Sequence, residues 1–167
     1  MKKNIISIAA ILIALLSVSV VRAQNPKISN PDKATVKLSS HYITDAAGNT
    51  SLQICVDNCR VTGLGNASSV AASLTTVGTA DVDCRNGGVD QGPVPGQSFN
   101  TTGGAVTLTA KNGVLIVSGV CVTIGGTCKN SGARWTSTVS NVELTDLYLT
   151  LNGSQVSLKD YIGQLNL

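Results

Sequence analysis

Short runs in which apolar and polar residues alternate constrain the fold of this chain more than any other feature. In three of them the alternation is strict, with the apolar members Ala80, Val82 and Cys84, then Val106, Leu108 and Ala110, then Leu147, Leu149 and Leu151. A period of two puts the apolar side chains on one face of a strand, which is typical of an antiparallel sheet with one wet face. Because the runs are short and regularly spaced, we expect an all-β fold, an antiparallel immunoglobulin-like β-sandwich.

Segments rich in Val, Thr, Leu and Ile are separated by Gly and Asn, a composition typical of strands and turns. The expected strands are residues 34–39, 52–57, 59–62, 70–76, 79–84, 105–110, 114–124, 135–144, 147–151 and 155–158. Residues 67–74 are rich in alanine, but they lie between a Gly-Asn turn and a run of threonines, so we expect a strand there and not a helix.

Two of the Asn-Gly pairs in the chain predict tight hairpins, Asn112-Gly113 and Asn152-Gly153. This dipeptide favours a type I′ turn, because both central residues need positive φ. In the first hairpin we expect Lys111 to pair with Val114 and Thr109 with Ile116. That register would place Cys121 inside the sheet.

The N-terminus has the pattern of a secretory signal. Lys2 and Lys3 precede an apolar run, which ends at Val21-Arg22-Ala23 with residues that a signal peptidase accepts. We expect cleavage after residue 23, the alternative being an uncleaved membrane anchor. The chain would then comprise a signal peptide over residues 1–23, a flexible leader over 24–33 and a single β-sandwich domain over 34–167, secreted to the periplasm or the extracellular space.

Cleavage would also change the charge. Removing Lys2, Lys3 and Arg22 lowers the number of Lys and Arg residues from 12 to 9, which equals the number of Asp and Glu residues. A mature chain of about zero net charge argues against a nucleic-acid partner and against electrostatic binding to a membrane after cleavage, because both need clustered positive charge.

All five cysteines follow the expected cleavage point: Cys55, Cys59, Cys84, Cys121 and Cys128. In an oxidising compartment they predict disulfides. A zinc site would favour short pairs such as Cys-x-x-Cys, whereas the nearest pairs here are Cys55 with Cys59 and Cys121 with Cys128, and neither has a histidine beside it. Five is an odd number, so one thiol stays free or forms an intermolecular disulfide. The pattern alone does not assign the partners.

Five short motifs resemble a family of small secreted bacterial β-sandwich proteins with no assigned activity. They are Gly63-Leu64-Gly65-Asn66, Cys84-Arg85-Asn86-Gly87-Gly88, Pro95-Gly96-Gln97, Lys111-Asn112-Gly113 and Cys128-Lys129-Asn130 followed by Trp135. The likeness covers roughly residues 50–158. The chain departs from the family at Lys129, where proline is usual, and in having Cys55, Cys59 and Cys121.

The resemblance implies a disulfide between Cys84 and Cys128, worth about 4 kcal/mol on the chain-entropy model. It leaves Cys55, Cys59 and Cys121 unassigned, with three pairs open among them. We expect Trp135 to be a structural core residue packed on the Cys84–Cys128 bridge, and not a platform on which sugars stack.

Reactive groups are few. The only histidine, His41, lies in a polar segment without a nucleophile motif, so we expect an exposed residue and keep a hydrolase only as an alternative. Glu143 with Asp146, and Asp81 with Asp83, could serve glycoside cleavage, but outer-face charge explains them more simply. A calcium site formed by Asp81, Asp83, Asn86 and Asp90 is a further alternative, although the spacing is not that of an EF-hand loop.

These observations favour a non-enzymatic binding or surface-structural module with no cofactor. A carbohydrate- or calcium-dependent adhesion module is the second interpretation. The partner would be a protein or a glycan, and residues 87–97, rich in Gly and Pro, would form either its binding loop or a linker.

Overall fold

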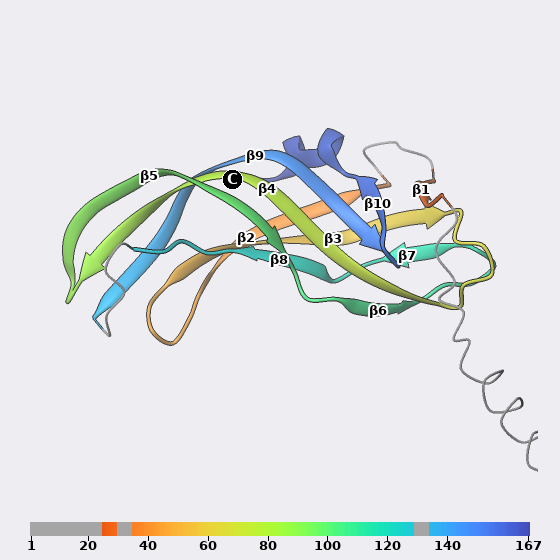
Figure 1. The fold of residues 1–167 in the computed structure, drawn as a ribbon, viewed down its shortest axis with the longest axis horizontal. Coiled ribbons are helices and arrows are strands. Elements are labelled where there is room, and N and C mark those ends of the chain that lie inside the picture. Colours follow the sequence, from red (N-terminus) through yellow and green to blue (C-terminus); the bar gives the residue numbers. More distant parts are fainter. Residues whose placement is uncertain (1–24, 30–34, 129–133) are drawn as a thin grey trace, which may run out of the picture.

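The computed structural model describes residues 25–29, 35–128 and 134–167 and shows a mostly β protein (Figure 1). The signal peptide and the motif residues Lys129 and Asn130 lie outside these ranges. The strands in the described residues are β1 (Lys27–Ile28), β2 (Lys37–Thr44), β3 (Thr50–Thr62), β4 (Ser69–Asn86), β5 (Val89–Thr102), β6 (Val106–Thr109), β7 (Leu115–Val117), β8 (Val120–Ile124), β9 (Trp135–Leu151) and β10 (Ser154–Ser157). A 3-10 helix, η1 (Lys159–Gln164), follows them.

The strands join in one mixed sheet, so the expectation of a purely antiparallel arrangement is wrong. β3 pairs with β1, β2, β7 and β8, whereas β4 pairs with β5, β6 and β9, and β10 pairs with β9. All these pairings are antiparallel. Among the described residues, the two groups meet in one parallel pair, Thr50 of β3 with Thr138 of β9. Beside this pair, Asn49 Oδ1 accepts a hydrogen bond from the Ser137 backbone N–H at 3.0 Å. The backbone of β9 thus has a hydrogen-bond partner at the point where it reaches β3.

β4 is the longest strand in the described residues and alternates without interruption along its length. Its buried positions are Val70, Ala72, Leu74, Thr76, Gly78, Ala80, Val82 and Cys84. Because β4 is paired on both edges, with β9 on one side and β5 and β6 on the other, its inward side chains lie wholly within the molecule. Figure 1 shows β5, β4 and β9 running side by side as long curved strands that cross β3 at an angle.

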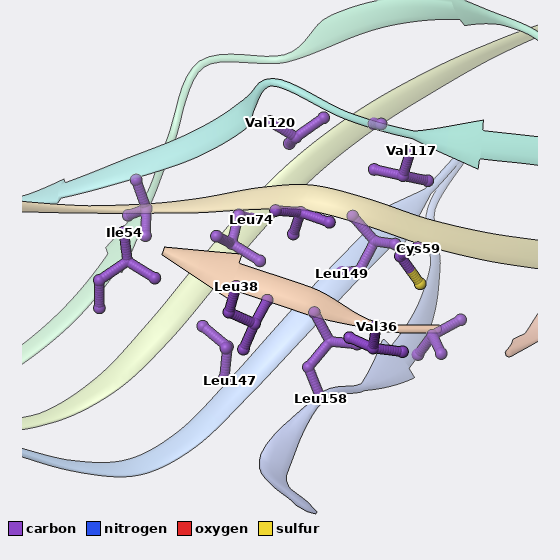
Figure 2. Close-up of a cluster of buried hydrophobic side chains, with 14 of the residues drawn as sticks. Val36, Leu38, Ile54, Cys59, Leu74, Val117, Val120, Leu147, Leu149 and Leu158 are labelled. Carbon is purple, nitrogen blue, oxygen red and sulfur yellow. The ribbon is translucent and has the colours of Figure 1, made fainter. Parts of the chain in front are cut away.

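The core lies between the two groups of strands. In Figure 2, Ile54 of β3 and Leu38 of β2 face Leu74 of β4 and Leu147 and Leu149 of β9. Nearly all members are Val, Leu, Ile or Ala, and the one aromatic ring in the cluster is Tyr161 of η1. The helix was not expected from the sequence; it brings Leu158 and Tyr161 onto the core between β2 and β9.

Several expected strands are continuous in the structure. Residues 52–57 and 59–62 both belong to β3, residues 70–76 and 79–84 to β4, and residues 135–144 and 147–151 to β9. The expected loop at residues 87–97 falls mostly within β5, and residues 67–74 contribute to a strand as expected. Residues 114–124 instead divide into β7 and β8 around Gly119, whose φ is +72°. Part of the expected leader is also ordered, since β1 pairs with β3 at Val61 and Thr62.

The two predicted Asn-Gly turns are present, but the first does not join a simple hairpin. Lys111 pairs with Val114 and Asn112 has a φ of +51°, as expected. The expected pair of Thr109 with Ile116 is wrong: β6 pairs with β4 and β7 pairs with β3, so the chain changes group at this turn. In the second hairpin, Leu151 pairs with Ser154.

Substitutions at two adjacent glycines, Gly103 and Gly104, can test how closely the chain after β5 approaches β8. A Cβ at Gly103 would collide with the backbone carbonyl oxygen of Cys121, whereas a Cβ at Gly104 would meet no atom within 4 Å. We therefore expect Gly103→Ala to lower the free energy of unfolding by about 1–3 kcal/mol, as overpacking does, and Gly104→Ala to change it by less than about 0.5 kcal/mol. Urea unfolding measures both, and equal effects of the two variants would contradict the close approach.

Candidate functional site

Two disulfides connect the strands. Cys84 at the inner face of β4 is bonded to Cys128, the pairing that the family resemblance implies. Cys55 of β3 is bonded to Cys121 of β8, and the two residues are direct partners in the strand register. Cys121 is only partly buried, which corrects its expected place inside the sheet. The bridge lies on the outer face of its group, because Cys55 alternates with the inward residues Ile54 and Val56.

A bulge explains why Cys59 takes no part in these bridges. Lys37 pairs with Asn58 and Leu38 pairs with Val56, so Asp57 is an extra residue in β3. An extra residue reverses the alternation beyond it, and Cys59 consequently faces the core with 0% of its surface exposed. Cys55 and Cys59 are also four residues apart in one strand, about 13 Å, and a disulfide requires less than about 7 Å between Cα atoms.

Cys59 is a free, buried thiol, which is the first of the two alternatives left open for the odd cysteine. Desolvation raises the pKa of the Cys59 thiol to about 11, and Figure 2 shows its sulfur among Val36, Val117, Leu149 and Leu158. A thiol is nucleophilic as the thiolate, so Cys59 is shielded from partners both sterically and by its protonation.

Asp81 anchors the most distinctive polar site of the described chain. The register of β4 shifts at this residue on both sides, against β5 between Ala80 and Val82 and against β9 between Thr79 and Asp81. The Gly96 N–H donates to Asp81 Oδ1 at 2.8 Å, and the Asn141 Nδ2 donates to Asp81 Oδ2 at 2.9 Å. Gly96 and Asn141 both have positive φ, +63° and +46°, so the backbone of each neighbouring strand is irregular at the residue that bonds the carboxylate.

An open hollow of ≈ 570 Å³ lies over this junction of β4, β5 and β9. Oxygen-bearing side chains dominate its wall, since its lining residues are Thr79, Asp81, Gly96, Asn141, Val142, Glu143 and Leu167. The hydrogen bonds from Asn141 and Gly96 lower the pKa of Asp81. The floor of the hollow therefore carries an ionised carboxylate that adjoining strands hold in place.

The four residues proposed for calcium do not converge. Asp83 accepts a hydrogen bond from Ser140 Oγ at 3.2 Å, and Asp90 accepts one from the Gly92 N–H at 2.8 Å. Asp81 and Asn86 are five residues apart on β4, about 16 Å, whereas calcium ligands lie within about 2.6 Å of the ion. Within the described ranges no group of three or more His, Cys, Asp or Glu side chains could hold a metal ion.

The other candidate residues are also dispersed. His41 is exposed on β2, as expected, and within the part of the chain described its imidazole makes no hydrogen bond or ion pair. Asp146 forms an ion pair with Lys159 at 3.3 Å, whereas Glu143 lines the hollow. The two carboxylates therefore do not act as a pair.

Trp135 lies outside the core cluster, which corrects its expected role as a core residue. It begins β9 opposite Asn86, beyond the last inward residue of β4, and is only partly buried. Whether it packs on the Cys84–Cys128 bridge stays a prediction.

Motif residues that are distant in the sequence meet at the start of β4. The segment Gly65 to Ser68 adjoins Ala110, Asn112 and Gly113, and together they line a smaller hollow of ≈ 200 Å³. The Ala110 N–H donates to the Ser68 carbonyl at 3.0 Å. These turns close the chain where it changes group, so their role is structural.

Thiol labelling tests the arrangement of the cysteines. We expect no reaction of the native protein with iodoacetamide at neutral pH, and one alkylated thiol, on Cys59, after denaturation without reductant. Mass mapping should then find the peptides Cys55–Cys121 and Cys84–Cys128. Rapid labelling of the native protein, or a disulfide that contains Cys59, would contradict the structure.

The lowered pKa of Asp81 has a consequence for stability at low pH. A carboxyl group whose pKa is lower in the folded than in the unfolded protein stabilises the fold above its unfolded value, here 3.8, and this contribution disappears as the pH falls through the folded value. We expect Asp81→Asn to be less stable than the wild type at pH 7, and the difference to shrink as the pH falls below 3.8 and through the lower pKa of the folded protein. Denaturant unfolding across this range measures the difference, and a difference independent of pH would argue against the anchoring carboxylate.

No helix in the described residues is long and apolar enough to cross a membrane. Comparison of the chain with protein-family models, curated proteins and solved structures finds no match. The likeness to small secreted bacterial β-sandwich proteins therefore stays a prediction, and the candidate site rests on the geometry around Asp81.

Proposed function

We propose that this chain is an exported, non-enzymatic binding module with an immunoglobulin-like β-sandwich fold. Two groups of strands that share one core, crossed at an angle, support the sandwich. Two disulfides among five cysteines support a periplasmic or extracellular location, because such bonds persist in oxidising compartments. The sequence pattern of residues 1–23 supports export through a cleaved signal peptide.

The hollow over Asp81 is the observation that carries the binding function. Its polar groups come from three neighbouring strands and lie on regular structure, which positions them more firmly than a loop would. Asp81 is fixed by two hydrogen bonds, and the adjacent Glu143 is exposed and free of the ion pair that engages Asp146. The result is an open, rigid surface of hydrogen-bonding oxygens.

A polyhydroxylated ligand fits this chemistry best. The hydroxyl of Thr79, the amide of Asn141 and the carboxylates of Asp81 and Glu143 can each accept hydrogen bonds from sugar hydroxyls. The absence of Lys and Arg from the lining residues disfavours anionic glycans. We therefore propose a neutral carbohydrate as the ligand. In a calcium-dependent alternative, the carboxylates of Asp81 and Glu143 would also bind a calcium ion.

A glycan array with the oxidised mature protein tests the proposal. We expect binding to neutral glycans that falls at least about tenfold in Glu143→Gln, as the loss of a charged hydrogen-bonding partner predicts, and is unchanged in Asp160→Asn, a matched change at an exposed acid of η1. Repeating the array with a chelator separates direct binding from calcium-dependent binding.

Two results would count against this site. Binding that Trp135→Ala abolishes and Glu143→Gln leaves intact would move the ligand to the aromatic ring at the start of β9. Failure to bind any neutral glycan would favour a surface-structural role over a carbohydrate-binding one.

A further inference from the structure

The two long edge strands of the sheet differ in how they are protected against pairing with another chain. An exposed edge presents unpaired N–H and C=O groups, and proteins usually block it with proline, charge or bulges. β5 carries such protection, because Pro93 and Pro95 lack an N–H and Gly92 and Gly96 bend the strand at positive φ. β2 has none over residues 41–44, and its only charged residue, Lys37, lies at the other end.

The hydrogen bonds at both ends of β2 show which of its backbone groups face outward. The Leu38 N–H points away from β3 to Gln164 Oε1 at 3.4 Å, and the Asp45 N–H points toward the Asn49 carbonyl at 2.9 Å. Backbone groups alternate in direction along an antiparallel strand. Ser40, Tyr42 and Thr44 therefore direct their N–H and C=O groups outward, whereas His41 and Ile43 direct theirs to β3.

The C-terminal segment covers only the first half of this edge. Gln164 contacts Leu38, and Ser40 Oγ donates to the Asn166 carbonyl at 2.9 Å. Beyond Ser40, no group in the described part of the chain pairs with the outward backbone groups of Tyr42 and Thr44. The adjoining side chains are exposed although they are apolar, Tyr42 at 48% and Ile43 at 36%.

We propose that two copies of this chain associate by antiparallel pairing of the β2 edge, with the two-fold axis at Ile43. Tyr42 of each copy then lies opposite Thr44 of the other, and their outward groups form four backbone hydrogen bonds. Ile43 packs against Ile43 of the second copy, because directly opposite residues without a hydrogen bond are about 4.5 Å apart. A two-fold axis closes the assembly as a dimer.

The same register brings complementary polar groups together. His41 lies opposite Asp45 of the second copy on the outer face, where the imidazole N–H can donate to the carboxylate. Hydrogen bonds from Asn49 lower the pKa of Asp45, so this acceptor is ionised at neutral pH. A register centred on Tyr42 would instead require the backbone of Ser40, which lies beside Asn166.

Sedimentation equilibrium of the oxidised mature protein over a range of concentrations tests the dimer. The contact is short, so we expect a weak monomer–dimer equilibrium that Ile43→Lys shifts at least about tenfold toward monomer. The matched control is Val89→Lys on the protected edge strand, where the side chain is 63% exposed, and it should leave the equilibrium unchanged. A monomer at every concentration would overturn the proposal and would favour pairing of this edge with a strand from another protein. Dimerisation of Ile43→Lys as strong as that of the wild type would also overturn it.

Cross-linking tests the register directly. In an Ile43→Cys variant, the two introduced thiols would lie within disulfide range across the two-fold axis, so oxidation should yield a covalent dimer. The control is Ile116→Cys, at an exposed strand position on β7, and it should remain monomeric under the same conditions. Dimers of Ile116→Cys alone, or equal yields from both variants, would contradict pairing at β2.

Discussion

The uninterrupted alternation of β4 is the constraint on which the rest of the structure depends. One strand supplies a buried residue at every second position from Val70 to Cys84, and it is paired along both edges. Long paired strands twist and bend, and here the mismatch among three of them is taken up by bulges around Asp81. The same strand thus provides the core on its inner face, the floor of the polar hollow on its outer face and the Cys84 disulfide at its end.

The strand composition of the chain was predictable, because alternation reports which face of a strand is buried. The ends of the strands were less so. Gly78 interrupts the run of residues that favour strands, yet it lies inside β4. Glycine is required there because a Cβ would collide with the Glu143 carbonyl oxygen of the paired strand β9. The residues 87–97 carry turn-forming Gly and Pro, but an edge strand tolerates proline on its unpaired side. In both cases tertiary pairing overrides local preference, which a sequence alone does not display.

The cysteines and the candidate site likewise depend on strand pairing that the local sequence does not reveal. Without the bulge at Asp57, Cys59 would share the outer face of β3 with Cys55, and nothing in the local sequence marks the extra residue. Asp81 was recognisable as an outward carboxylate on a strand. Its partners Gly96 and Asn141 were not, because they come from strands 15 and 60 residues away. A hollow built from three strands depends on register, and register is fixed by the whole sheet.

The end of the molecule near Cys84 is held differently from its centre. The core cluster becomes sparse there, and Trp135 is only partly buried. The Cys84–Cys128 bridge links β4 to the segment that follows β8, and so ties the two groups of strands together, at a stabilisation of about 4 kcal/mol. Two side-chain amides act in the same region: Asn49 bonds Ser137, and Gln97 Nε2 donates to the Thr127 carbonyl at 2.9 Å. Because covalent and hydrogen bonds replace apolar packing at this end, the outer face beside it can remain polar and still keep a fixed shape, as a surface that recognises a ligand requires.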